Sequence, residues 1–340
     1  MKAAVFHGPK EPLRIEDVPT PAPGPGEVLV KVAACGLCHT DLHYIDHGTP
    51  TVKKPPMILG HEASGTIAGM GAGASGWKEG DRVLVPAVLT CGRCRFCREG
   101  RENICESMIM VGNNIDGAYA EYLAVPAKDL VALPADLPLA ESSVIADALS
   151  TPYHAVKVRG EVRVGMRVVV VGCGGIGLNL VQIATAAGAA VTAVDKVPAR
   201  LALAREFGAQ AVLDPTQFER PEKELRKITG GGADVAFEAV GHPATQRLAC
   251  DALRKGGRVV LVGYSPQDAA LPVSRIMYHE LEVVGSLGCR PVDYAPLVEM
   301  VRAGRIRLER VVTGRVPLAE INSGLDRLRR AEGVRTIVVP

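Results

Sequence analysis

The stretch VVVVGCGGIG, residues 168–177, decides how the fold of this chain is interpreted. Four consecutive valines are typical of a buried strand, and glycines 172, 174 and 177 follow in the spacing G-x-G-x-x-G. These glycines permit a tight turn and allow a pyrophosphate to approach the backbone at the N-terminus of the next helix. The stretch therefore predicts a dinucleotide-binding turn. Its expected contact residues are Gly172, Gly174, Gly175, Ile176 and Gly177.

Asp195 supports this interpretation because it stands at the end of the next expected strand. Its carboxylate can accept hydrogen bonds from the adenosine ribose and would repel a 2′-phosphate, which favours NAD over NADP. Lys196 and Arg200 are nearby cations that weaken this preference. The alternative is a glycine-rich turn with a solvated aspartate, but the strand, the helix and the acidic residue together favour the dinucleotide site.

Strands and helices alternate around this stretch, which predicts a parallel, doubly wound sheet of the α/β class. Residues 168–194 carry no charge, but their five glycines and two side-chain amides divide them into strand, turn, helix and strand. We therefore expect α/β core here and no membrane span. Strands are expected at 167–171, 190–194, 211–213, 234–238 and 258–262, and helices at 176–187, 198–207 and 244–254. The first third shows shorter β-like runs at 28–34, 65–68 and 82–86.

The composition is that of a globular protein with two domains, since 340 residues are many for a single core. The formal net charge is only +2 and no block of like charge occurs, so we expect no nucleic-acid partner. Residues 1–17 become polar too early for a signal peptide, which indicates a cytoplasmic protein. Thiols stay reduced in that compartment, and clustered cysteines there more often bind metal than form disulfides.

Four cysteines at short spacings lie in the run CGRCRFCREGRENIC, residues 91–105. Four thiolates can close a tetrahedron around zinc with no open position, which is the arrangement of a structural site. An iron–sulfur cluster and two disulfides are the alternatives at this point. The pattern favours structural zinc bound by Cys91, Cys94, Cys97 and Cys105.

A second candidate metal site is dispersed over the chain. Cys38 and His61 lie in the first domain, and Asp147 interrupts the apolar run 144–149, where a carboxylate is costly unless it is paired or bound to a cation. A thiolate, an imidazole and a carboxylate with one position left for water or substrate describe an open catalytic zinc site. Each residue alone also has an ordinary structural explanation, and their spacing does not show that they converge.

The motifs together resemble a known family, the zinc-dependent medium-chain alcohol dehydrogenases. CGLCHTDLH at 35–43, GHEASG at 60–65, the four-cysteine run, VVGCGGIG at 170–177 and VRTIVV at 334–339 occur in that family's order. The resemblance implies a GroES-like β-rich catalytic domain of residues 1–149 and 288–340, with the structural zinc lobe at about 91–105. It further implies a Rossmann NAD-binding domain of residues 150–287.

The same resemblance implies roles for individual residues. Cys38 and His61 match catalytic zinc ligands, Asp147 stands where many members have cysteine and some bacterial members have aspartate, and Glu62 matches the neighbouring carboxylate that can exchange with water on the metal. Thr40 and His43 match the proton relay, and Asp41 matches the acid that orients the zinc-bound histidine. The positions that match cofactor contacts are Thr151, Val262, Arg335 and His39.

The expected activity is NAD-dependent oxidation of an alcohol to an aldehyde or ketone, and the reverse reduction, with one catalytic and one structural zinc per chain. Alternatives are a dehydrogenase of polyols or of cyclic or thioester-bound hydroxyls, a zinc-free quinone or enoyl reductase, and a non-enzymatic binding protein. Ala87 replaces larger residues that narrow the pocket in the family, which hints at bulky substrates. The resemblance also implies a homodimer or homotetramer, and the apolar strand 281–286 is a candidate pairing edge.

Overall fold

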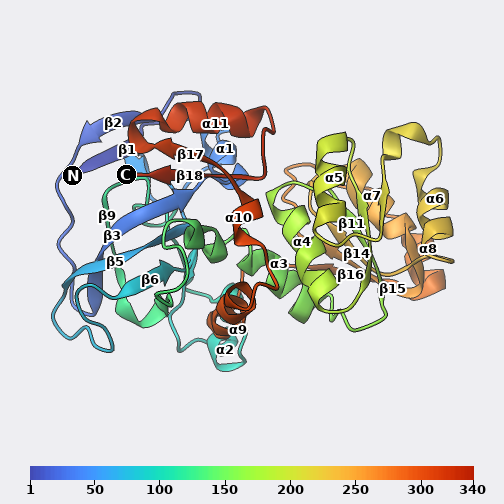
Figure 1. Ribbon diagram of the computed structural model, residues 1–340, viewed down its shortest axis with the longest axis horizontal. Helices are drawn as coiled ribbons and strands as arrows, with labels where there is room; N and C mark the ends of the chain where they lie inside the picture. Colours follow the sequence, from blue (N-terminus) through green and yellow to red (C-terminus); the bar gives the residue numbers. More distant parts are fainter. The chain divides into compact units, whose positions relative to one another are not determined.

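The computed structural model describes residues 1–340, and the chain divides into two compact units. The first unit comprises Met1–Ser150 and Gly288–Pro340, and the second comprises Thr151–Leu287. The first unit therefore contains both ends of the chain, which appear in blue and in red in Figure 1, whereas the second is one continuous segment.

A seven-stranded sheet forms the framework of the first unit. Its strand order is β10-β6-β5-β3-β18-β17, and β9 also pairs with β3. The late strand β18 lies between β3 and β17, antiparallel to β3 with Ile337 opposite Gly36. The strands are β3 (Glu27–Gly36), β5 (Ala63–Met70), β6 (Arg82–Val85), β9 (Tyr122–Pro126), β10 (Val131–Ala132), β17 (Val312–Pro317) and β18 (Arg335–Val339).

β3 shows why these residues form strands around a core. Val28, Val30 and Val32 alternate along it and are at most 5% exposed, as expected for a strand with one face packed inside. Smaller sheets and helices complete the unit. They are β1 (Lys2–Phe6), β2 (Arg14–Asp17) and β4 (Met57–Ile58); β7 (Val88–Leu89) and β8 (Ile109–Met110); α1 (His39–Ile45), α2 (Arg95–Arg98), η1 (Glu102–Ile104), η2 (Ala127–Asp129), η3 (Glu141–Ala146), α9 (Pro291–Arg302), α10 (Leu308–Val311), η6 (Leu318–Glu320) and α11 (Ile321–Arg329).

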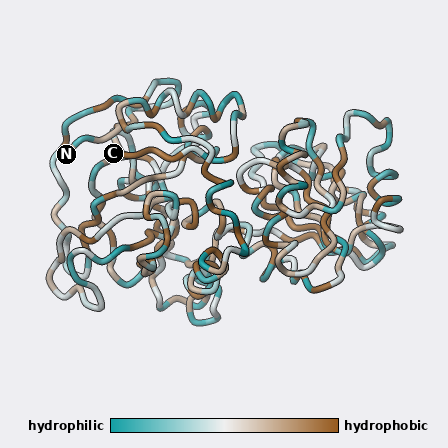
Figure 2. The backbone as a smooth tube through the Cα atoms, in the orientation of Figure 1, coloured by the Kyte–Doolittle hydropathy of each residue, from teal (hydrophilic) through white to brown (hydrophobic).

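The second unit contains a six-stranded parallel sheet in the order β13-β12-β11-β14-β15-β16. This is the Rossmann order, and ligands bind such sheets at the carboxyl ends of the strands where the order reverses, here between β11 and β14. Figure 2 shows hydrophobic stretches, in brown, running through the interior of this unit. The strands are β11 (Arg167–Val171), β12 (Ala190–Val194), β13 (Ala211–Leu213), β14 (Ala233–Glu238), β15 (Leu253–Leu261) and β16 (Glu282–Gly285).

The helices of the second unit connect these strands, which completes the doubly wound arrangement. Together with the β-rich first unit, this confirms the predicted fold class. The uncharged segment 168–194 forms β11, α4 and β12, and none of the helices combines the length and apolar character needed to cross a bilayer. The helices are α3 (Ser150–His154, which begins at the boundary), η4 (Ala155–Arg159), α4 (Gly175–Ala186), α5 (Pro198–Glu206), η5 (Pro215–Gln217), α6 (Pro221–Ile228), α7 (Pro243–Asp251) and α8 (Val273–His279).

Two neighbouring predicted boundaries are wrong. The helix expected at 244–254 ends at Asp251, and the strand expected to begin at residue 258 begins at Leu253. Leu253 is fully buried and pairs with Ala233, while Gly256 at φ +67° allows the irregular register before regular pairing resumes. The glycines in the sequence LRKGGR suggest a loop, but here they lie within an irregular strand.

Candidate active site

Three side chains with metal-binding chemistry meet in the first unit. Cys38 immediately precedes α1, His61 lies between β4 and β5, and Asp147 follows η3. The Cys38 Sγ lies 3.4 Å from the Asp147 Oδ2, and the His61 Nε2 lies 3.7 Å from the same oxygen. The three ligand atoms all lie within 4.8 Å of one another. The structure thus brings together residues that are far apart in sequence.

The spacing of these atoms fits a single zinc ion. Zinc binds sulfur at about 2.3 Å and nitrogen or oxygen at about 2.0–2.2 Å, so ligand atoms on a tetrahedral edge lie roughly 3.4–3.6 Å apart. The two measured separations lie close to that range. Three protein ligands leave one tetrahedral position open, which is the composition of a catalytic and not a structural site.

Asp41 lies behind the imidazole of His61. Its carboxylate is fully buried, and its Oδ1 is 3.6 Å from the His61 Nδ1 without a hydrogen-bond partner. Burial alone would lower the pKa of His61, but the negative charges of Asp41 and Asp147 outweigh it and hold that pKa well above the usual value. An acid that accepts from the non-ligating nitrogen would fix the ring for metal binding through Nε2.

Tyr119 is a member of this cluster that the sequence does not indicate. Its side chain is fully buried, and its hydroxyl lies 2.7 Å from the Asp41 Oδ2. The tyrosine lies in an ordinary run, GAYAEY, and only the tertiary contact shows its connection to the site.

A buried ion pair lies next to the three ligand atoms. Arg335 places its Nε 2.9 Å from the Glu62 Oε2 and one Nη 3.1 Å from the Asp147 Oδ2. Glu62 also accepts from the Ala148 N–H at 2.7 Å, and Gly36 makes room for it, since a Cβ there would lie 1.5 Å from the Oε2. Burial raises the pKa of Glu62 to about 7, although the charge of Arg335 opposes this. Glu62 is therefore held by Arg335 and stands outside the group of three ligand atoms.

Helix α1 carries the other residues expected at the site. Asp41 begins it by accepting from the Cys38 N–H at 3.0 Å. Thr40 is half-buried, with its Oγ1 3.6 Å from the Cys38 Sγ, and His43 is half-buried one turn further on. Burial and then the charge of His47 lower the pKa of His43, and the two rings lie 5.5 Å apart. His39 is exposed at the start of the helix.

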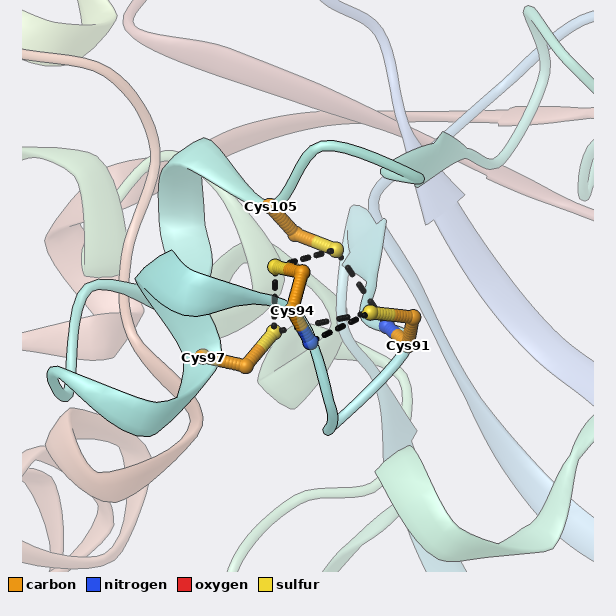
Figure 3. A group of neighbouring side chains, drawn as sticks. All are labelled: Cys91, Cys94, Cys97 and Cys105. Carbon is orange, nitrogen blue, oxygen red and sulfur yellow. Dashed lines mark hydrogen bonds between the residues drawn. The ribbon is translucent and has the colours of Figure 1, made fainter.

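The four cysteines of the lobe point their sulfur atoms toward a common centre (Figure 3). Cys94 Sγ lies 3.5 Å from Cys97 Sγ and 3.8 Å from Cys105 Sγ, and Cys91 Sγ lies 3.9 Å from Cys97 Sγ. A zinc tetrathiolate has edges of about 3.8 Å, whereas a disulfide bond is about 2.05 Å long. The backbone N–H groups of Arg93 and Cys94 lower the pKa of Cys91 to about 6, whereas burial raises the pKa of Cys97 to about 12. The geometry fits one tetrahedral ion and does not fit two disulfides.

The glycine-rich turn of the second unit has the features of a phosphate cradle. Gly172 adopts φ +93°, and a Cβ on Gly177 would lie 1.6 Å from the Gly172 carbonyl oxygen, so both positions require glycine. Gly174 precedes α4, no side chain caps that helix, and a Cβ on Gly174 would meet nothing within 4 Å. The helix N-terminus therefore keeps its backbone donors and open space for an anion. The remaining turn residues, Gly175 and Ile176, form the first positions of α4.

Asp195 follows β12 beside this turn. Its carboxylate accepts from the Cys173 N–H at 2.7 Å and from the Val197 N–H at 2.9 Å, while an Arg200 Nη lies 3.8 Å away. Lys196 is exposed. The backbone thus fixes the carboxylate at the strand end, where a bound ribose would lie.

Glu238 is a second residue that the sequence analysis missed. It ends β14 fully buried, and its Oε1 accepts from the N–H groups of Val240 and Gly241 at 2.9 Å. Val262 donates its N–H to the Glu238 carbonyl. Burial raises the pKa of Glu238. An acid at the end of the apolar run DVAFE was the available signal, and its carboxylate here fixes the turn that leads from β14 into α7.

Comparison with known proteins agrees with this architecture. Residues 24–135 match the family described as alcohol dehydrogenase GroES-like domain, and residues 175–303 match the zinc-binding dehydrogenase family. An alcohol dehydrogenase of Geobacillus stearothermophilus is 35% identical over 98% of this chain and 97% of its own. The sorbitol dehydrogenase of Bacillus subtilis is 34% identical over 96% and 93%. The crystal structure of the Aeropyrum pernix alcohol dehydrogenase superposes with a TM-score of 0.92 at 35% identity, covering 100% of both chains.

The chain belongs to the zinc-dependent medium-chain dehydrogenase family, which confirms the resemblance seen in its motifs. It is an oxidoreductase, and the geometry of both units is that of the family's fold.

Proposed function

We propose that the protein is an NAD-dependent zinc alcohol dehydrogenase, which oxidises an alcohol to an aldehyde or ketone and catalyses the reverse reduction. The observation that carries this proposal is the convergence of Cys38, His61 and Asp147 at distances that suit one zinc ion. Family membership supports it, since the residues of this site lie in the matched GroES-like segment or close to it in space.

Each unit then has its own task. Residues 1–149 with 288–340 form the catalytic domain, and residues 150–287 bind the dinucleotide. One zinc occupies the catalytic site and a second is held by the four-cysteine lobe, whose sulfur tetrahedron supports a structural function. Reduced thiols at both sites agree with a cytoplasmic enzyme.

The residues of the site divide the work of the reaction. When bound, zinc supplies Lewis acidity that lowers the pKa of the substrate hydroxyl, and the nicotinamide accepts the hydride. Thr40 accepts the proton of the substrate hydroxyl at its Oγ1 and releases its own hydroxyl proton, which His43, three residues along the same face of α1, transfers toward solvent. Burial and the charge of His47 lower the pKa of His43, which favours the neutral imidazole that can accept a proton. Asp41 holds His61 in orientation.

Asp195 sets the preference for NAD. A carboxylate at this place accepts from the ribose hydroxyls and repels a 2′-phosphate. Arg200, 3.8 Å away, offsets part of its charge, so some NADP activity should remain. Thr151, Val262, Arg335 and His39 complete the expected cofactor contacts. The ratio of kcat/KM for NAD and NADP measures this preference, and a ratio below one would contradict it.

The protein also forms a homodimer or homotetramer in this proposal. β16 is the edge strand of the parallel sheet, and its residues are mostly exposed. Apolar side chains on the preceding helix α8, among them Met277 at 72% and Tyr278 at 74% exposure, continue the surface. Light scattering of the purified protein tests the assembly, and a monomer at micromolar concentration would refute it.

The decisive experiment combines metal analysis with turnover. The purified protein should contain two zinc ions per chain and reduce NAD with alcohols, and Cys38→Ser should lose one ion and nearly all turnover. A Cys38→Ser variant that retains both would overturn the metal assignment. A protein that lacks metal but turns over would instead be a zinc-free reductase of the same fold.

A polyol is the second candidate substrate, because the identity to the Bacillus subtilis sorbitol dehydrogenase, 34%, almost equals the 35% identity to the Geobacillus stearothermophilus alcohol dehydrogenase. A panel of primary, secondary, benzylic, cyclic and polyol substrates compared by kcat/KM separates the two. Ala87 is buried and small, so we expect bulky alcohols to be accepted.

A further inference from the structure

The orientation of the Asp41 carboxylate depends on only a few donors. Its Oδ2 receives the Cys38 N–H at 3.0 Å and faces the Tyr119 hydroxyl at 2.7 Å, while its Oδ1 has no partner except the His61 Nδ1 at 3.6 Å. Because two donors hold Oδ2, the other oxygen is left facing the imidazole. Loss of one donor would free the carboxylate to rotate away from His61.

Tyr119 is itself held on several sides. Its N–H donates to the Leu59 carbonyl at 3.0 Å, and its carbonyl accepts from Ala4 at 2.8 Å. Its ring lies against Gly60, where a Cβ would be 2.7 Å from a ring carbon. Gly60 directly precedes His61, so the same tyrosine contacts the backbone beside the ligand and the acid behind it.

The phenol is suited to act as a donor. Burial, reinforced by the charge of Asp41, raises the pKa of Tyr119 well above its usual value, so the hydroxyl keeps its proton. A carboxylate that accepts a short hydrogen bond from a neutral donor is fixed in place.

We infer that Tyr119 is a positioning residue of the catalytic metal site, which holds Asp41 so that Asp41 orients His61 for zinc. The inference rests on the proposed metal site and adds a further residue to it. Partners behind a metal ligand typically change metal affinity 10–100-fold when they are removed. Tyr119 acts one hydrogen bond further out, so we expect the lower end of that range.

The test is the zinc affinity of the zinc-loaded protein, measured by competition with a chelator, for Tyr119→Phe. The phenylalanine keeps the ring against Gly60 and removes only the hydroxyl. We expect the Kd of one zinc to rise about tenfold, while the four-cysteine zinc serves as an internal reference and is unchanged. Tyr122→Phe is the control, because Tyr122 lies close by in the sequence on β9, is only part-buried and makes no hydrogen bond to Asp41. An unchanged Kd in Tyr119→Phe overturns the inference.

A double-mutant cycle separates positioning from a general effect on the fold. Asp41→Ala should weaken zinc binding, and adding Tyr119→Phe should weaken it little further, because the hydroxyl then has no side chain to hold. Strictly additive losses would mean that Tyr119 acts through another route, which overturns the inference. Cobalt placed at the site should show a changed visible spectrum in Tyr119→Phe and an unchanged one in Tyr122→Phe.

The outcomes also distinguish this inference from the proposed function. If Cys38→Ser leaves the zinc content unchanged, the metal site itself is wrong and the inference fails with it. If Cys38→Ser loses one zinc and Tyr119→Phe binds both as tightly as the parent, only the positioning role is refuted.

Discussion

Replacing Arg335 with methionine should reveal how strongly its buried ion pairs stabilise the first unit. The guanidinium is 3% exposed and lies within 3.1 Å of oxygens of both Glu62 and Asp147. Methionine occupies similar space without charge, so both carboxylates lose their cation. Removing one partner of a buried pair typically costs about 3–5 kcal/mol, because an uncompensated charge remains inside.

The cost should depend on pH through Glu62. Its pKa in the folded protein is about 7, above the value of about 4.3 for an unfolded chain, so the folded state binds the proton more tightly. Protonation of Glu62 therefore stabilises the folded state in full below about pH 4.3, and this stabilisation is lost as the pH rises through about 7. Without Arg335 the pKa of Glu62 in the folded protein rises further, so the folded state continues to lose stability at higher pH. The destabilisation should therefore grow from pH 6 to pH 9, by at most about 1.4 kcal/mol per pH unit.

Thermal unfolding measures the effect, in a Cys38→Ser background that keeps a metal from neutralising Asp147. The first unit has about 200 residues, for which 1 kcal/mol corresponds to about 2–4 °C, so Tm should fall by about 6–20 °C at pH 7. The control is Arg329→Met, which removes a part-exposed pair with Asp46 and should cost at most about 1 kcal/mol. A Tm within 2 °C of the parent at both pH 6 and pH 9 would refute the reasoning.

Three further predictions concern the sites. Gly174→Ala should fold normally but weaken NAD binding at least tenfold in a fluorescence titration, because its methyl group enters the open space at the N-terminus of α4. Gly177→Ala should instead destabilise the second unit, because its Cβ would lie 1.6 Å from the Gly172 carbonyl oxygen. Equal behaviour of the two would contradict this account of the turn. His47→Gln should move the acid limb of the kcat/KM profile to higher pH, because a positive charge that lowers the pKa of His43 is removed, and His43→Gln should abolish that limb; unchanged profiles would exclude His43 from the relay. Cys97→Ser should remove the zinc of the four-cysteine lobe and lower the free energy of unfolding, while the catalytic zinc stays bound. Retention of both ions on metal analysis would disprove the structural site.

The fold could be predicted from local patterns to a large extent. The valine run, the glycine spacing and the alternation of strands and helices belong to short segments, and β11, β12 and β13 lie where these patterns place them. The boundary between α7 and β15 was missed because the glycines at the start of β15 look like a loop in sequence. In the structure these glycines allow an irregular strand register, so β15 begins before them.

The site was less accessible from sequence because it is built by tertiary contacts. Cys38 and Asp147 are 109 residues apart, and nothing in either segment shows that they meet. Tyr119 carries no motif at all. Arg335 was assigned to the cofactor by resemblance, yet its described partners are the two carboxylates and the Leu37 carbonyl of the first unit. Spacing along the chain indicates which residues can do chemistry, but not which neighbours fix their charge.

The position of β18 within the sheet has a consequence for protein synthesis. The second unit is one continuous segment that is complete after residue 287, whereas Cys35 and Gly36 at the end of β3 acquire their partners in β18, and Glu62 its arginine, only when residues 335–339 have been made. During translation the end of β3 therefore lacks its partner on the side away from β5, whereas the start of the strand is already paired with both β5 and β9. This short edge stays open to other chains until β18 is made. We expect the second unit to fold on the ribosome, and the first to complete its sheet and its buried ion pairs only after release.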